Sequence, residues 1–147
     1  MTARSHWGVT PRQSIEAECA RRGRQSVVAR CCSLIKSEDA DIALILALGG
    51  PHARRVQDGD PRSGRQYWLR VWGTRGLLWA WDDAALDTIV IALGDPAWRV
   101  RELAAKVVAR HQLGDTLPAV LDLRDDPVPR VRAAATRAIA ILTRAGA

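Results

Sequence analysis

Residues 95–110 read DPAWRVRELAAKVVAR, and residues 126–141 read DPVPRVRAAATRAIAI. The two stretches lie 31 residues apart and share seven of sixteen residues, more than chance readily produces. A weaker third copy over residues 66–93 places Arg75 at the register of Lys106. A period of this length is typical of stacked helical repeats.

Each clear copy predicts a helix with one buried stripe, because the apolar positions within residues 100–108 recur every three or four residues. We expect Asp95 and Asp126, each followed by Pro, to supply the N-cap and a first residue with helical φ. The preceding segments, 83–93 and 117–123, predict the first helix of each hairpin.

The rest of the chain also predicts helices and no strands. Thr10 and Gln13 match a capping box, which predicts a helix over residues 11–22 that ends at Gly23. Residues 49–66 contain four Gly and two Pro, which predicts an irregular loop that either folds onto an anionic partner or is a tolerated insertion. Further helices are expected over about 25–36, 39–48 and 67–81. The predicted fold is all-α, with about four helical hairpins in a single domain over residues 1–147.

The run Asp-Pro-x-x-x-Val-Arg-x-x-Ala-Ala, at 95–105 and with a final Thr at 126–136, resembles HEAT-like repeats. This repeat type is also found in bilin-lyase-related proteins. The resemblance implies a right-handed α-α superhelix whose second helices line a concave binding face. It also implies structural roles, through hydrogen bonds between repeats, for Asp95, Arg101, Asp126 and Arg132. Arg side chains at the same position of successive repeats would repel one another, so they need a carboxylate between them. This requirement agrees with the structural roles of the two Asp residues.

The composition restricts the class of protein. With 147 residues, 48% of them hydrophobic, the chain fits one globular domain and not a disordered segment. Its apolar runs are too short to cross a bilayer, and its start matches no secretion signal, so we expect a cytoplasmic address. A net charge of +6 favours anionic partners.

Arg75, Lys106 and Arg137 recur every 31 residues outside the predicted buried stripe. Because packed helices lie about 10 Å apart, we expect these cations to form a row along the second helices. Such a row suits an acidic protein segment or a nucleic acid, although exposed helix positions are also often basic without a binding role. The predicted partner-binding set also includes Arg110, Trp98 and Trp81.

Six Trp residues occur in a chain without Phe. By spacing, Trp68, Trp72 and Trp79 share one face of the predicted helix over 67–81, which favours a role in the core. A surface that stacks on bases or on aromatic peptide side chains is the alternative.

The sequence Trp81-Asp82-Asp83, together with Trp98, resembles a feature of HEAT-like DNA-alkylation-repair glycosylases. That resemblance implies rings that hold a cationic base and an Asp that supports its charge. An Asp at a helix start is more commonly a cap, however, and no complete catalytic motif is present. We therefore expect a non-catalytic scaffold that binds a protein or acidic peptide without a cofactor, with nucleic-acid binding as the alternative.

The cysteines and histidines predict neither a disulfide framework nor a metal site. Cys19, Cys31 and Cys32 are odd in number, and the three His residues are scattered. Adjacent residues on a helix point about 100° apart, so we expect one of Cys31 and Cys32 to face the core and the other to lie at its edge.

Overall fold

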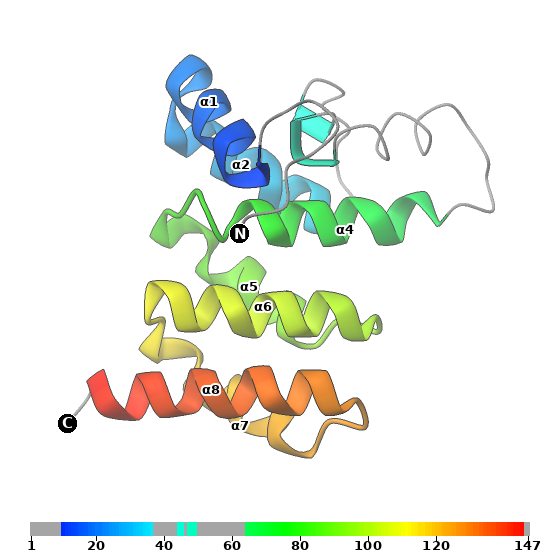
Figure 1. Ribbon diagram of the computed structural model, residues 1–147, viewed down its shortest axis with the longest axis vertical. Coiled ribbons are helices and arrows are strands. Elements are labelled where there is room, and N and C mark those ends of the chain that lie inside the picture. The colour runs from blue at the N-terminus through cyan, green and yellow to red at the C-terminus, as the bar shows by residue number, and fades with distance from the viewer. Residues whose placement is uncertain (1–9, 37–43, 46, 50–63, 146–147) are drawn as a thin grey trace. The chain divides into compact units, whose positions relative to one another are not determined.

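The computed structural model describes residues 10–36, 44–45, 47–49 and 64–145 (Figure 1). It divides into two compact units, Met1–Asp82 and Asp83–Ala147, which are described separately below. All regular structure in these described ranges is helical, which confirms the predicted all-α class. None of the described helices is long and apolar enough to cross a membrane. The single domain expected over residues 1–147 stays a prediction.

The first unit begins with the capping box that the sequence predicted. Helix α1 spans Pro11–Arg22; the Gln13 amide donates to Thr10 Oγ1 at 3.1 Å, and the Thr10 amide donates to Gln13 Oε1 at 2.9 Å. Gly23, at φ 90°, ends this helix and precedes α2, Arg24–Ile35. The predicted third helix lies partly outside the described residues, of which 44–45 and 47–49 are helical, and most of the predicted loop lies outside them.

Helix α4, Arg65–Gly76, packs against α2 through two glycines. A Cβ on Gly73 would lie 2.7 Å from the Cys31 carbonyl oxygen, and one on Gly76 would lie 2.7 Å from Cys31 Sγ. Both distances are too short for a real Cβ, so the missing side chains let the helices approach closely.

The predicted end of this helix at residue 81 is wrong, because α4 stops at Gly76. After Gly76 the chain forms turns, in which the Ala80 amide donates to the Gly76 carbonyl oxygen. The low helix propensity of glycine favours this change from helix to turn. Trp68 and Trp72 stack with ring centroids 5.8 Å apart, and Trp72 is buried as expected. Trp79 leaves the helix, so the expected face of three Trp residues does not form.

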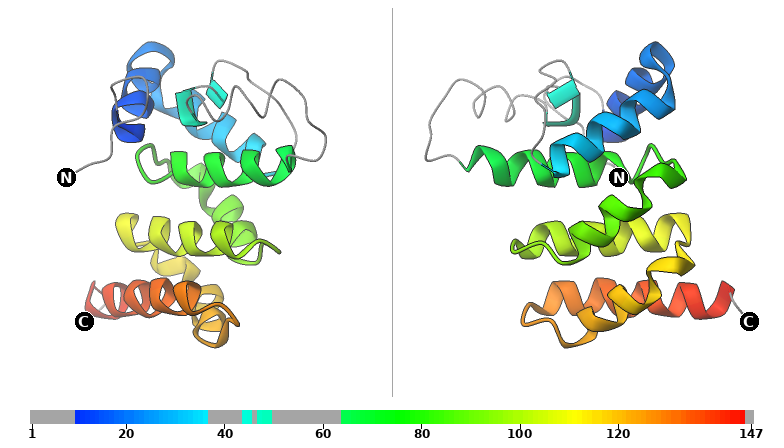
Figure 2. Two further views of the ribbon diagram at one scale, coloured as in Figure 1. Left: turned by 45° about the vertical axis from the view of Figure 1, so that its right-hand side comes forward. Right: turned by 180° about the vertical axis from the view of Figure 1, so that it is seen from behind.

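The second unit consists of two helical pairs in two layers (Figure 2). Helices α5 (Leu86–Leu93) and α7 (Leu117–Asp122) form one layer, and α6 (Trp98–His111) and α8 (Pro129–Ala145) form the other. Helices α6 and α8 run in the same direction side by side (Figure 1). Three short 3-10 helices precede or follow the first-layer helices: η1 (Asp83–Ala85), η2 (Gly114–Thr116) and η3 (Leu123–Asp125).

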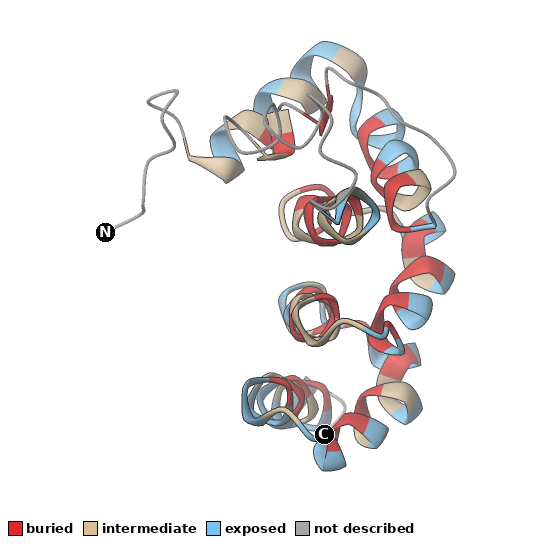
Figure 3. Ribbon diagram, turned by 90° about the vertical axis from the view of Figure 1, so that its right-hand side faces the viewer, coloured by how far each residue is buried: buried red, intermediate tan, exposed pale blue. Residues whose placement is uncertain are grey.

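The core of this unit lies between the two layers. Figure 3 shows α6 and α8 end-on, with exposed residues on the side away from α5 and α7. Most of the apolar positions that the period predicted are buried: Val100, Ala104, Val107, Val108, Val131, Ala135 and Ala138. Leu103 was predicted in the same buried stripe but is only half-buried. Because each pair covers the apolar side of the next, the predicted hairpin stacking is confirmed within this unit.

The expected capping by Asp95 and Asp126 is wrong. Helix α6 begins at Trp98 and α8 at Pro129, so each Asp lies three residues before its helix. The Asp95 carboxylate instead accepts from the Ala97 amide at 2.8 Å, and the Asp126 carboxylate accepts from the Val128 amide at 2.9 Å. Each Asp closes a turn on its own backbone, an alternative that Asp side chains readily offer.

Candidate functional site

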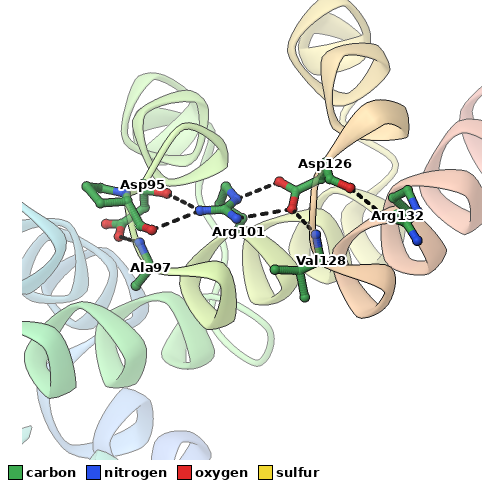
Figure 4. A network of polar contacts seen from close by, with 7 residues as sticks. Asp95, Ala97, Arg101, Asp126, Val128 and Arg132 are labelled. Atoms are coloured by element: carbon green, nitrogen blue, oxygen red, sulfur yellow. Dashed lines mark hydrogen bonds and ion pairs between the residues drawn. The ribbon is translucent and has the colours of Figure 1, made fainter.

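Arg101 links the two helical pairs of the second unit (Figure 4). Its Nε lies 2.7 Å from Asp126 Oδ2, and its Nη2 lies 3.1 Å from Asp126 Oδ1. Its Nη1 donates to the carbonyl oxygens of Asp95 at 2.8 Å and Pro96 at 3.0 Å. One guanidinium therefore fixes the turn before its own helix and the turn before the next second helix.

Asp126 is held in its ionised form at this junction. The hydrogen bond from Arg101 is the largest cause that lowers the pKa of its carboxyl, and the Val128 amide and the charges of Arg101 and Arg132 add to it. Burial opposes these effects by raising the pKa, but the net direction is downward. Charge-assisted hydrogen bonds of this kind favour the anion.

Arg132 repeats part of the pattern of Arg101 one period later. Its Nη1 donates to the Asp126 carbonyl oxygen at 2.7 Å, as Arg101 Nη1 does to Asp95. The four residues expected to have structural roles thus lie in one network (Figure 4). Arg132 differs from Arg101 in being exposed.

Charge in the second unit is divided between its two layers. The first-layer helices and the three 3-10 segments carry five Asp residues and one basic residue, Arg124. Helices α6 and α8 carry one acidic residue, Glu102, against eight basic residues: Arg99, Arg101, Lys106, Arg110, Arg130, Arg132, Arg137 and Arg144. The second layer is therefore the basic side of this unit.

Four positions on each second-layer helix form one solvent-facing stripe, and we call the two stripes together the second-helix face. Their shared spacing of four, three and four residues keeps them on one side of a helix. All are half-buried or exposed: Arg99, Leu103, Lys106 and Arg110 on α6, and Arg130, Ala134, Arg137 and Ile141 on α8. The face combines basic groups with half-exposed apolar ones.

Glu102 and Arg130 form a cluster that the sequence analysis did not single out. Glu102 is buried, and its Oε1 accepts from Lys106 Nζ at 2.9 Å and from Arg130 Nη2 at 3.1 Å. Its Oε2 is buried without a hydrogen-bond partner among the described residues. The guanidinium carbons of Arg130 and Arg99 lie 5.2 and 5.3 Å from the ring centroid of Trp98. In the sequence, the sign of this cluster was Glu102, which lies four residues before Lys106 and is the one acidic residue on helices α6 and α8.

The structure places the predicted binding residues in different surroundings. Lys106, Arg110 and Arg137 are exposed on the second-helix face, and Trp98 lies beside it under Arg130. Trp81 is half-buried in the first unit.

The expected exposure of Arg75 is wrong. Its Nη2 donates to the Leu48 carbonyl oxygen, and its Nε is buried without a partner among the described residues. Burial lowers the pKa of this guanidinium. Leu48 lies outside the 31-residue repeat, so the period gave no sign of this contact. Arg75 is therefore not included in the second-helix face.

The cysteines follow the predicted arrangement. Cys31 is buried and Cys32 is half-buried, so one faces the core and the other lies at its edge. Burial is the main cause that raises the pKa of the Cys31 thiol. Within the part of the chain that the structure describes, no group of three or more His, Cys, Asp or Glu residues can hold a metal ion.

The comparisons with known proteins agree with this architecture. A family model described as HEAT repeats matches residues 56–140, a range that contains α4 to α7 and most of α8. No curated protein and no solved structure matches the chain. The similarities to bilin-lyase-related proteins and to DNA-alkylation-repair glycosylases are not shown by these comparisons.

Proposed function

The chain belongs to the HEAT-repeat proteins, and from that premise we propose that it is a non-catalytic scaffold whose second-helix face binds an acidic segment of a partner protein. Repeat proteins of this architecture offer extended surfaces for binding other macromolecules. The division of charge between the two layers is the observation that supports this face as the contact surface.

The mixed chemistry of the face favours a protein over a nucleic acid. Leu103 and Ile141 are half-exposed among Lys106, Arg110 and Arg137. An amphipathic acidic helix can cover such apolar groups while its carboxylates contact the surrounding cations. A phosphate backbone uses only the charges. We therefore place an acidic helical segment first and nucleic acid second.

Glu102 reduces the net positive charge of the second-helix face. It neutralises part of the charge of Lys106 and Arg130, whose side chains are nevertheless 49% and 66% exposed. Arg137 is exposed and forms no ion pair with any residue in the described ranges. Arg137 is thus the cation most available to an incoming carboxylate, and Lys106 comes next.

Two labelled peptides provide the test: an amphipathic helical peptide with a Glu-rich polar face, and the same peptide with Gln in place of Glu. Fluorescence anisotropy with the full chain measures the binding of each. We expect the Glu peptide to bind and the Gln peptide to bind much more weakly. Lys106→Glu and Arg137→Glu should each weaken Glu-peptide binding about tenfold, because each replaces an attraction with a repulsion.

Arg124→Glu is the matched control, because Arg124 is exposed in η3 on the acidic layer. It makes the same change in charge away from the second-helix face, so binding should persist. Equal loss in this control, or equal binding of the two peptides, contradicts the proposal. Binding of duplex DNA that weakens linearly in log salt and is lost in Arg137→Glu, without peptide binding, would support the nucleic-acid alternative.

A further inference from the structure

We propose that the outer side of the first layer in the second unit is a docking surface for a basic amphipathic helix of a partner protein. We call this surface the first-helix face, and it consists of six outward positions: Asp87, Val90 and Ile91 on α5, and Pro118, Leu121 and Asp122 on α7. It belongs to the opposite layer from the second-helix face. The inference therefore goes beyond the function proposed for that face and does not depend on it.

Helix α5 is apolar on the side that faces solvent as well as on the side that faces the core. Six of its eight residues are apolar, and Asp87 is its one charged residue. Ile89 and Leu93 are buried, whereas Val90 and Ile91 are 42% and 55% exposed. Among the described residues, these two are the large hydrophobic side chains that remain exposed. A helix that is apolar all round is normally covered on every side, so α5 has the pattern of a helix with a further partner.

Helix α7 extends the apolar surface. Leu121 lies 31 residues after Val90, at the same position of the following pair, and is half-buried, while Pro118 is exposed. Helices α5 and α7 contact each other, so these positions lie on neighbouring helices. Figure 3 shows exposed residues on the side of both helices that points away from α6 and α8. This side faces outward from the layer and not along the stack, so the next helical pair does not cover it.

Acidic side chains flank the apolar positions. Asp87 and Asp122 are exposed on the face itself, and Asp125 is exposed directly after it in η3. Within the described ranges, none of these three carboxylates forms an ion pair. The chain as a whole has a charge of +6, so this negative surface is local. Such a surface attracts a basic partner and repels the phosphates of nucleic acids and anionic lipids.

A basic amphipathic helix matches both features of the face. Its apolar stripe can cover Val90, Ile91 and Leu121, while its Lys or Arg side chains contact Asp87 and Asp122. A second copy of this chain fits less well, because each copy carries a charge of +6 and the two repel each other. The occupant is therefore a helix of another protein.

Three labelled peptides test the proposal with the full chain by fluorescence anisotropy. The first is an amphipathic helical peptide with a Leu stripe and a Lys-rich polar face. The second has Gln in place of Lys, and the third has Ser in place of Leu. We expect the first peptide to bind and each of the others to bind at least about tenfold more weakly, because the face uses charge and apolar contact together.

Two substitutions locate the contact, and each has a matched control. Ile91→Ala should weaken binding of the Lys peptide about fivefold, because it removes apolar surface that the peptide covers. Ile141→Ala makes the same change on the second-helix face and should leave binding unchanged. Asp122→Lys should weaken binding about tenfold, whereas Glu16→Lys, at an exposed position of α1 in the other unit, should have little effect. Circular dichroism verifies that each variant remains helical.

Three outcomes would overturn the proposal. The Lys peptide does not bind, the three peptides bind equally, or Ile91→Ala and Asp122→Lys act no more strongly than their controls. Sedimentation velocity of the original chain tests a second copy as the occupant. Self-association that Ile91→Ala disrupts would overturn the assignment to another protein.

These outcomes are separate from those of the proposed function. The Glu-rich peptide tests the second-helix face, and the Lys-rich peptide tests the first-helix face. Failure of one peptide to bind therefore leaves the result for the other face unchanged.

Discussion

The guanidinium of Arg101 binds both carboxylate oxygens of Asp126, which lies 25 residues further along the chain. The two side chains are 14% and 5% exposed, so the pair is largely shielded from water. A shielded pair differs from a surface ion pair, because removing one partner leaves the other charge mostly shielded from water and without its counter-charge. Several properties of the second unit follow from this contact.

Asp126→Asn should destabilise the second unit by about 2–3 kcal/mol. The amide keeps the shape of the side chain but removes the negative charge, which leaves Arg101 unpaired in a mostly buried position. Urea unfolding followed by circular dichroism measures the change. Asp125→Asn, at the exposed neighbouring position, is the control and should lie within about 0.5 kcal/mol of the original protein. Equal effects of the two changes would refute this account.

The same contact predicts a loss of stability in acid. Asp126 has its pKa lowered below the ordinary value of 3.8, first by the hydrogen bond from Arg101. The unfolded chain therefore binds the proton more readily than the folded protein, and acid favours unfolding. The contribution is fully present above the ordinary pKa and disappears as pH falls through the lowered folded value. Urea midpoints from neutral pH to acid should fall more steeply for the original chain than for Asp126→Asn, and parallel curves would contradict the prediction.

Gly73→Ala should destabilise the first unit by about 1–3 kcal/mol or more. The new Cβ would lie 2.7 Å from the Cys31 carbonyl oxygen, and a main-chain atom in a helix moves only with its neighbours. Thermal unfolding measures the effect. Gly114→Ala is the control, because no atom lies within 4 Å of its Cβ position and its φ is not positive. A loss of similar size at both positions would contradict the packing argument.

The sequence predicted those parts of the fold that depend on local pattern or on the repeat. Thr10 and Gln13 define the start of α1 through contacts three residues apart, and the apolar stripe beginning at Val100 locates the core of the second unit. The 31-residue period also placed Arg101 near the start of one second helix and Asp126 shortly before the start of the next. Such features need only helix geometry and repetition.

Other features depend on contacts that neither pattern contains. Arg130 reaches Glu102 across 28 residues, a separation different from the repeat, because a long side chain can cross to the adjacent helix. Arg75 is half-buried and donates to the carbonyl oxygen of Leu48, a residue that lies outside the repeat. The early end of α4 at Gly76 reflects a competition between helix and turn that the position of the Trp residues does not reveal.

The two adjacent cysteines should differ in reactivity. Alkylation requires the thiolate, and burial raises the pKa of the Cys31 thiol while also excluding the reagent. Cys32 is half-buried at the edge of the core. In the folded protein we expect Cys31 to react with iodoacetamide at least about a hundredfold more slowly than Cys32, because it reacts only after local or global opening. Timed alkylation followed by peptide mass spectrometry measures both rates.

Gly76→Ala provides the matched test of this mechanism. Its Cβ would lie 2.7 Å from Cys31 Sγ and 3.0 Å from Leu48 Cδ2, so the substitution should destabilise the packing around the thiol. If opening controls alkylation, the Cys31 rate should rise with the equilibrium constant for opening, while the Cys32 rate changes much less. Equal rates at the two cysteines in the original protein would show that Cys31 is accessible in the folded state.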